Sequence, residues 1–404
     1  MPLEMTSTVE GPARGKRGSE DRLFTLDFIF ATLANVANSL GQQILVATLP
    51  VYVISTGGTK AEAGLVAGAM TFAALFFRPY IGWLTDAWRR RPLVLIGTSC
   101  NGLASVVYLL AGSIPALLLG RVVHGVGLGC YTTAANAYVA DIAPSGRRAE
   151  AMGLFSTAYA LALVVGPVIG FMIVEATGFR SLFCFTGGLA LLAFVISLFA
   201  RERRQPEEIK HRPWSLRTGI VAIEALPIGW TALCMGMGYG AISAFVAIFA
   251  QSRGIQNPGF YFMVDAIALT ATRAFSGRVA DRYGRTVVIV PCVILMAASM
   301  AMLPVAHGLI SFVISAAMFG VGFGAGHPAT MALLVDRVQP DKRGLAMSTF
   351  FSGFDLGITI GSFLLGVVSQ YWGFGMMWPI SAACTLLGLA GLLADHRRGL
   401  LARR

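Results

Sequence analysis

The chain has 404 residues, of which 56% are hydrophobic and only 13% are charged, and its mean hydropathy is +0.70. A soluble protein of this length needs far more polar surface, so the composition excludes an ordinary soluble fold and indicates a protein that crosses a membrane several times. The net charge of +11 comes from short basic clusters between apolar runs. That pattern is typical of membrane proteins, and we therefore expect no nucleic-acid partner.

The N-terminal tail, residues 1–23, is polar and has neither the apolar stretch nor the cleavage site of a signal peptide. We therefore expect the first hydrophobic segment to stay in the mature protein. The six cysteines lie in or near apolar segments without a CxxC pair, which favours packed thiols over a disulfide framework or a zinc site. We expect no metal and no bound cofactor.

A helix that spans a bilayer needs about 20 apolar residues. The sequence predicts twelve such spans, at residues 24–52, 61–86, 92–112, 115–140, 149–174, 179–200, 218–250, 259–281, 286–306, 309–335, 345–370 and 374–394. One long hydrophilic segment, 201–217, separates six spans from six. The fold class is therefore all-α integral membrane, with an N-terminal bundle (24–200), a linker (201–217), a C-terminal bundle (218–394) and a short tail (395–404).

The basic residues also set the direction of the spans. With both termini inside, the inner segments hold 25 of the 31 Lys and Arg residues, the outer loops hold three, and three lie within spans. Lys and Arg accumulate on the cytoplasmic side of membrane proteins, so we expect both termini to be cytoplasmic.

The two halves of the chain repeat at a constant spacing. The stretch GWLTDAWRRRP starts at Gly82, and GRVADRYGRTV starts at Gly277, 195 residues later. The same spacing relates Arg78 to Arg273, and further pairs are Asp86 and Asp281, Asp141 and Asp336, Arg148 and Arg343, and Gly166 and Gly361. Each half begins and ends on the same side, so the repeats are parallel and related by an axis along the membrane normal.

The repeated stretch resembles the loop signature of the major facilitator superfamily, G-x-L-x-D-x-x-G-R-R, between the second and third spans. The second copy is the closer match, because Gly284 keeps the glycine that Arg89 replaces in the first copy. GRVVHGVGLG in span four resembles the family's R-x-x-Q-G segment, with His124 where glutamine is usual. The resemblance covers nearly the whole chain and implies two six-helix bundles around a central cavity that opens alternately to each side.

The charged loops are candidate gating elements. An acid and several arginines at the cytoplasmic helix ends can form ion pairs that hold the two bundles together in one state. The alternative is that the basic residues only fix the topology, which explains the arginines but not the repeated aspartate. The candidate gating residues are Gly82, Asp86, Arg90, Asp141, Arg148, Gly277, Asp281, Arg285, Asp336 and Arg343.

An ionisable residue within a span costs about 2.5–3.5 kcal/mol on insertion scales and marks a candidate functional site. Arg121 lies inside span four, and His124 follows on the same helical face. The resemblance gives Arg121 a role in substrate binding or proton coupling, and the alternative is a tie to a backbone carbonyl. His124 either exchanges protons or stays a neutral hydrogen-bonded group.

Asp355 is the candidate proton carrier in span eleven. With Ser352, Thr359 and Ser362 it forms one polar stripe, which lipid would penalise, so we expect the stripe to face the cavity. The alternative is a fixed ion pair with Arg273 or Arg121. Other candidate cavity residues are Asn35, Asn38 and Gln42 in span one, Tyr131 in span four, Tyr159 in span five and His327 in span ten.

Three further ionisable residues lie in spans two and eight. Asp265 is either a cavity carboxylate or a residue near the outer interface. Arg78 and Arg273 are expected to reach toward the cytoplasm or to tie neighbouring helices together, with a possible part in gating.

Span five contains GLFSTAYALALVVGPVIGF, in which Gly153, Gly166, Pro167 and Gly170 resemble the G-x8-G-x3-G-P-x2-G-G pattern of proton-coupled antiporters. Ala162 and Phe171 replace two of its glycines. In this family the pattern goes with export, and the alternative is an ordinary transmembrane helix rich in glycine.

We therefore predict a proton-driven exporter of a small amphiphilic or zwitterionic molecule, acting as a monomer in the bacterial inner membrane without enzymatic activity. A drug, an opine-like or siderophore-like chelator, a sugar and an amino acid derivative all remain possible substrates. The main alternative is a proton symporter that imports a sugar or an organic acid. A non-transporting membrane sensor is disfavoured, because we find no soluble effector domain that could carry a signal. The sequence also contains no P-loop or hydrolase motif, which disfavours an ATP-driven pump and an enzyme.

Overall fold

The computed structural model describes residues 23–144, 147–201, 222–339 and 343–401, and every regular element in these ranges is a helix. The first half contains α2 (Leu26–Ser55), α3 (Lys60–Ala87), α4 (Arg90–Leu110), α5 (Ile114–Ile142) and α6 (Arg148–Phe199). The second half contains η4 (Ile223–Ala225), α7 (Leu226–Ser252), α8 (Gly259–Tyr283), α9 (Arg285–Met302), η5 (Leu303–Val305), α10 (Gly308–Arg337), α11 (Arg343–Leu386) and α12 (Gly388–Leu401). The prediction of an all-α protein is confirmed. The N-terminal tail and the predicted linker beyond Arg201 lie outside the described residues.

Eight of the described helical segments are long and apolar enough to cross a membrane. They lie in α3, α4, α5, α6, η4 with α7, α9 with η5, α10, and α11 with α12. Helices α2 and α8 have 30 and 25 residues but are not among these eight segments. The helical segments therefore follow the hydrophobic runs of the sequence.

The two longest helices are each divided at one glycine. Gly178 in α6 has φ 83° and ψ 176°, and Gly373 in α11 has φ 74° and ψ 173°. This left-handed, non-helical conformation is open to glycine and costly for residues with a Cβ atom. Each glycine separates the two consecutive hydrophobic runs that the sequence predicts there, and the two glycines are themselves 195 residues apart.

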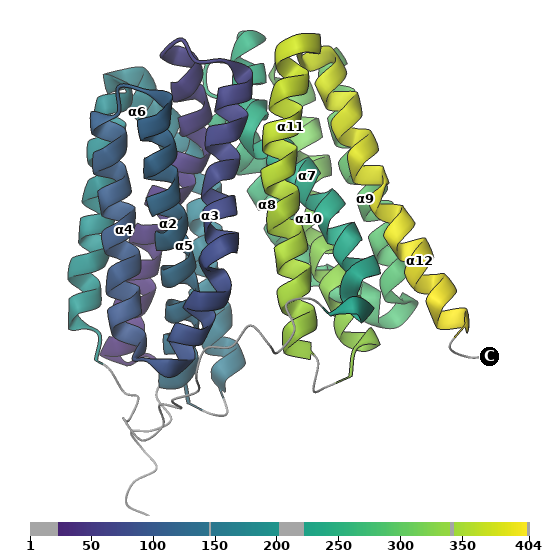
Figure 1. The fold of residues 1–404 in the computed structure, drawn as a ribbon, viewed down its shortest axis with the longest axis horizontal. Helices are drawn as coiled ribbons and strands as arrows, with labels where there is room; N and C mark the ends of the chain where they lie inside the picture. Colours follow the sequence, from purple (N-terminus) through teal and green to yellow (C-terminus); the bar gives the residue numbers. More distant parts are fainter. Residues whose placement is uncertain (1–22, 145–146, 202–221, 340–342, 402–404) are drawn as a thin grey trace, which may run out of the picture.

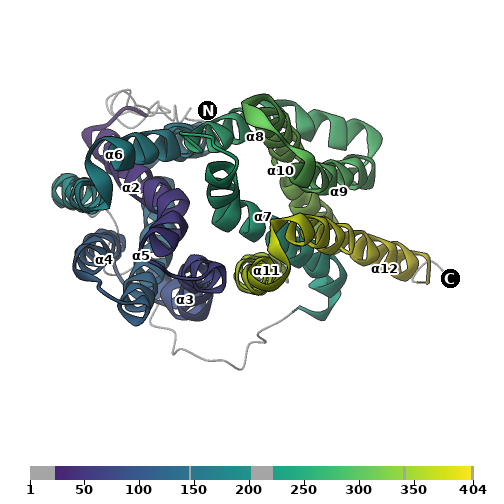
Figure 2. The same ribbon diagram turned by 90° about the horizontal axis from the view of Figure 1, so that it is seen from above.

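The helices form two bundles side by side, α2–α6 and α7–α12 (Figure 1). We call the end of the molecule where Arg201 and Ala222 lie the linker side, and the opposite end, where Lys60 and Gln370 lie, the Lys60 side. Seen from above, α3 lies beside α11, and α6 lies beside α8 (Figure 2). These two contacts, the α3–α11 seam and the α6–α8 seam, join the halves.

Both seams depend on a glycine at the equivalent position. A Cβ atom on Gly64 of α3 would collide with the backbone oxygen of Ser362, and a Cβ on Gly259 of α8 would collide with the backbone of Val168. Glycine at these positions allows the helix backbones to approach closely, as in other membrane helix pairs. At the Lys60 side, Lys60 also donates from its Nζ to the Ser369 carbonyl at 3.3 Å and lies over the Phe374 ring. The halves are therefore packed together at this end.

The internal repeat extends to the packing inside each half. Gly125 of α5 abuts the backbone oxygen of Met70, and Gly320 of α10 abuts that of Asp265 in the same way. Gly127 and Gly322 likewise face α4 and α9. Each of these contacts recurs at the spacing of 195 that relates the two halves of the sequence. The halves thus have the same helix packing as well as related sequences.

Candidate functional site

A cavity lies between the two halves, where α2, α3, α5, α6, α7, α8, α10 and α11 meet. Its two connected parts have volumes of about 380 and about 280 Å³. Both parts share a wall made by Gln42, Thr132, Tyr159, Tyr239, Arg273 and Phe323. A space of this size matches a drug-sized ligand. It is the candidate functional site.

An ion pair crosses between the halves at the cavity wall. Nη1 of Arg78 on α3 lies 2.9 Å from Oδ2 of Asp355 on α11, and the two side chains are 34% and 9% exposed. Oδ2 of Asp355 accepts no hydrogen bond from the residues that the structure describes, so the contact is an ion pair without hydrogen-bond alignment. The sequence suggested Arg273 or Arg121 as the partner of Asp355, and the structure gives Arg78 instead.

Arg121 and His124 are both buried in α5, but they have different surroundings. Arg121 lines the larger part of the cavity, donates from Nη1 to the Met70 sulfur at 3.5 Å, and has a buried Nε without a hydrogen-bond partner among the described residues. His124 lies behind it, with Nδ1 3.2 Å from the Tyr108 hydroxyl. Arg121 therefore faces the cavity, whereas His124 has a hydrogen-bond partner within the N-terminal half.

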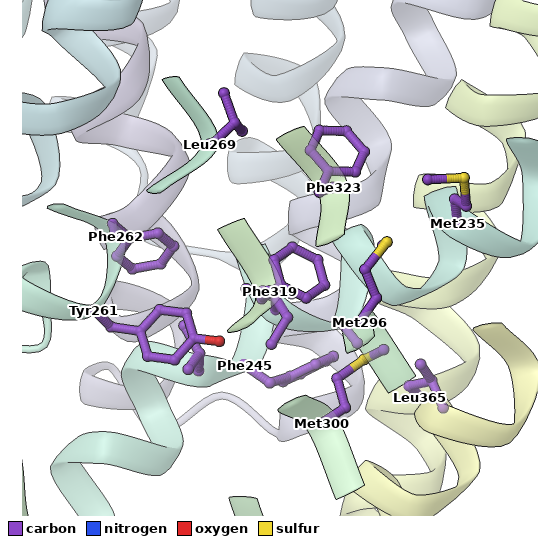
Figure 3. Packing of buried hydrophobic residues seen from close by; sticks show 14 of the residues in the cluster. Met235, Phe245, Tyr261, Phe262, Leu269, Met296, Met300, Phe319, Phe323 and Leu365 are labelled. Atoms are coloured by element: carbon purple, nitrogen blue, oxygen red, sulfur yellow. The ribbon is translucent and has the colours of Figure 1, made fainter. Parts of the chain in front are cut away.

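Aromatic side chains of the second half form the opposite wall. Phe323 of α10 packs against Tyr239 of α7 at 5.0 Å and Phe354 of α11 at 5.7 Å between ring centroids, and His327 lies 4.8 Å from Phe354. Figure 3 shows how Phe323 continues the buried cluster that contains Phe319, Met235 and Met296. Of the residues in this aromatic wall, the sequence predicted only His327. An isolated phenylalanine or tyrosine in an apolar helix does not indicate whether it faces a cavity, a neighbouring helix or lipid.

Asp265 lies beside the cavity and not in its main walls. The residue is 6% exposed, and its Oδ1 has no hydrogen-bond partner among the described residues. It borders a small pocket of about 20 Å³ together with Gln43 of α2 and Pro167 of α6. Of the two sequence-based alternatives, the structure shows a buried carboxylate between the halves.

The polar residues predicted in spans one, four and five fall into two groups. Gln42, Tyr131 and Tyr159 line the cavity, as does Asn35, whose Nδ2 also donates to the Phe155 carbonyl at 3.0 Å. Asn38 does not line it. Its Oδ1 accepts a hydrogen bond from Asn101 Nδ2 at 2.8 Å inside the N-terminal half, which accounts for its orientation.

The polar stripe of span eleven divides in the structure. Asp355 faces the cavity together with Phe351, Phe354 and Ile358. Thr359 and Ser362 lie at the α3–α11 seam, where they abut Gly68 and Gly64, and Ser352 is absent from the lining. The physical reason is that small polar residues permit close helix contact, so part of the stripe faces a helix instead of the cavity.

The candidate gating residues form ion pairs within each half. Nε of Arg90 lies 3.2 Å from Oδ2 of Asp141, and Nε of the equivalent Arg285 lies 3.1 Å from Oδ2 of Asp336. Arg285 also pairs with Asp281. In this conformation these pairs tie helices of one half together and do not bridge the halves.

The remaining gating candidates make fewer contacts. Arg148 and Arg343 are exposed. A Cβ atom on Gly82 or Gly277 would meet nothing within 4 Å, so close helix approach does not explain these glycines. The side chain of Asp86 lies outside the described residues.

The antiporter-like residues of span five contribute to a close contact with α2. A Cβ on Gly166 would lie 3.0 Å from Gln43 Cβ, and one on Gly170 would lie 3.1 Å from Ile44 and from Thr48. Pro167 lies between them and borders the Asp265 pocket. A Cβ on Gly153, in contrast, would meet nothing within 4 Å. Three of the four residues therefore lie at the α2–α6 contact or the inner pocket.

Comparisons with known proteins agree with this architecture. The model of the major facilitator superfamily matches residues 31–271 and 257–401. The staphylopine export protein of Staphylococcus aureus is 24% identical over 374 residues, which cover 89% of this chain and 91% of that protein. Multidrug resistance protein MdtG of Escherichia coli is 25% identical over 359 residues, 84% of this chain and 86% of that protein.

Among solved structures, a mutant of the nucleoside transporter NupG superposes with a TM-score of 0.79 at 15% identity, covering 92% of this chain and all of that one. At this identity the likeness concerns the fold. The family match spans both halves of the chain, and the relatives are transporters. The chain therefore belongs to the major facilitator superfamily, as a multi-pass membrane transporter that resembles the efflux branch of the family and is not an enzyme.

Proposed function

We propose that this transporter exports a small amphiphilic or zwitterionic molecule from a bacterial cell by proton antiport, with the cavity open alternately to each side of the inner membrane. The chain crosses the membrane twelve times in this proposal, since Gly178 and Gly373 each divide one long helix into two spans. Both termini are cytoplasmic, in keeping with the distribution of basic residues. The linker side then faces the cytoplasm, and one chain supplies all the cavity walls.

The observation that carries the proposal is the ion pair between Arg78 and Asp355. It joins α3 to α11 across the two halves at the edge of the cavity. When Asp355 is ionised, its attraction to Arg78 stabilises the state that is packed on the Lys60 side. A proton on Asp355 removes that attraction and favours separation of the seam. The protonation state of Asp355 would thus change the relative stability of the two states, which is the property that coupling to a proton gradient requires.

Two further observations support export as the direction of transport. Gly166 and Gly170 lie at the α2–α6 contact, and Pro167 borders the adjoining pocket, in the helix that resembles the antiporter pattern. The two bacterial relatives are named for staphylopine export and for multidrug resistance. Both observations favour export over import.

The test is a proteoliposome assay with an imposed pH gradient and a pH-sensitive dye inside the vesicles. Amphiphilic cations, zwitterionic chelators, aromatic acids and sugars are added to the wild type, to Asp355→Asn and to Glu175→Gln, a control that removes an exposed carboxylate away from the cavity. We expect substrate-evoked proton movement opposite to the substrate, lost in Asp355→Asn and kept in Glu175→Gln. Proton and substrate moving together would replace the exporter with a symporter. Antiport that survives Asp355→Asn would shift proton coupling to Arg121, His124 or Asp265.

A further inference from the structure

The two seams between the halves have the same packing but different charges. On the α3–α11 seam, Arg78 pairs with Asp355. The residue equivalent to Arg78 on the α6–α8 seam is Arg273, and the residue equivalent to Asp355 is Ala160, at the same spacing of 195. Ala160 and Arg273 line the same part of the cavity. A methyl group thus occupies the position that a carboxylate occupies on the other seam.

Arg273 has no acidic side chain at ion-pair distance in the part of the chain that the structure describes. Its neighbours in the cavity wall are Tyr159 of α6 and Tyr239 of α7, which offer hydroxyl groups but no negative charge. A guanidinium group stays charged under all physiological conditions, and at membrane depth it requires a strong compensating interaction. Arg273 therefore presents an uncompensated positive charge to the cavity.

The other charged residues of the cavity do not remove this excess. Three arginines, at positions 78, 121 and 273, line the larger part, and Asp355 is the one acidic residue in its described walls. Arg78 compensates Asp355, and Arg121 is paired with the Met70 sulfur, not with a carboxylate. Even with Asp265 of the adjoining pocket ionised, guanidinium groups outnumber carboxylates. The cavity is electrostatically suited to a negatively charged ligand.

We propose that the cavity binds an organic anion, with Arg273 as the partner of its carboxylate or similar acidic group and the aromatic wall as the partner of its apolar part. The inference names the charge of the substrate and so rests on the proposed transport function. The planar guanidinium group can donate two parallel hydrogen bonds to a carboxylate. Phe323, which lines both parts of the cavity, lies in the same wall as Arg273 and can contact the ligand beside its charged end.

The test measures binding to the purified full-length protein in detergent with three fluorescent probes of similar size: dansyl-glycine, its neutral methyl ester and the cation dansyl-cadaverine. We expect the anion to bind at least about tenfold more tightly than the ester, which corresponds to one charge-assisted interaction. Arg273→Gln should remove that preference, and Arg273→Lys should keep part of it.

The decisive variant is Ala160→Asp, which restores on the α6–α8 seam the acidic residue of the other seam. We expect it to remove the preference for the anion, as Arg273→Gln does, because Arg273 then has an internal partner. Ala160→Asn has nearly the same volume, so the difference between the two variants reports charge alone. The melting temperature and the size-exclusion profile of each variant, compared with those of the wild type, verify that the fold is retained.

Equal or tighter binding of the cation or the ester by the wild type would overturn the proposal, as would no binding of any probe. An anion preference that survives both Arg273→Gln and Ala160→Asp would also overturn it. The binding assay uses no pH gradient, so it is independent of proton coupling. An anion preference combined with failed antiport would therefore leave this inference standing and reject the proposed function.

Discussion

Arg78 and Asp355 come from different halves of the chain, and their side chains meet at 2.9 Å on the cavity wall. If the attraction between these two charges controls the change of state, transport should depend on their being opposite and not on which of the two positions carries the arginine. Arg78→Asp and Asp355→Arg should each reduce transport at least about tenfold, because like charges then face each other. The double exchange should restore part of the rate. The measurement is substrate counterflow in proteoliposomes. A double variant whose transport rate does not exceed that of the less active single variant would count against a role for the pair.

Gly64 and Gly259 permit the backbone contact at the two seams. Gly64→Val should separate α3 from α11, since the added atoms meet the Ser362 backbone, which cannot move aside as a side chain can. Amide hydrogen exchange should then rise in residues 60–70 and 358–370. Gly259→Val should raise exchange at the other seam. Gly82→Val is the matched control, because a Cβ there meets nothing within 4 Å. Unchanged exchange in both seam variants would contradict the close packing.

The Arg90–Asp141 and Arg285–Asp336 pairs hold helices within each half. Their aspartates are 39% and 52% exposed. Exposed ion pairs contribute about 0.2–1 kcal/mol, so Asp141→Asn and Asp336→Asn should each lower the free energy of unfolding by no more than that. Denaturant unfolding in detergent measures the change. If these residues have the predicted gating role, transport should fall in variants whose stability is nearly normal.

The antiporter-like glycines should differ in their tolerance of larger side chains. Gly170→Val places methyl groups against Ile44 and Thr48 of α2, and overpacking of this kind costs about 1–3 kcal/mol. Gly153→Ala has open space and replaces glycine with the best helix former, so its stability should be equal or higher. Melting temperatures of the purified variants distinguish the two. Equal losses at both positions would show that packing against α2 is not the reason for Gly170.

The organisation of the chain could be predicted from the sequence because hydrophobic runs and a repeat at constant spacing are local signals. Gly178 lies between two predicted spans, and Gly373 does so as well. The prediction that Asp355 lies at the cavity needed only the cost of a carboxylate facing lipid. These features depend on whether each helix face meets lipid or water, and the pattern of polar and apolar residues shows that directly.

The partners across the cavity could not be predicted, because they depend on the register between helices far apart in sequence. Arg78 could be predicted as the partner of Asp355 only if the register of α3 relative to α11 were known, and the sequence does not give that register. The stripe containing Thr359 was interpreted as cavity-facing, yet a polar face also suits a close helix seam. Asn38 shares a helical face with Gln42, but Asn101 on α4 determines its orientation.

The division of α6 and α11 at Gly178 and Gly373 has a mechanical consequence. The part of each helix before the glycine, residues 148–177 and 343–372, contains the seam residues Val168 and Ser362, whereas Trp378, beyond Gly373, is fully buried. The two parts of each helix are thus joined at a single residue with unusual backbone freedom, so their relative angle can change without unwinding either part. Because the charge pair lies on one seam alone, the attraction that opposes separation of the halves acts to one side of the pseudo-symmetry axis.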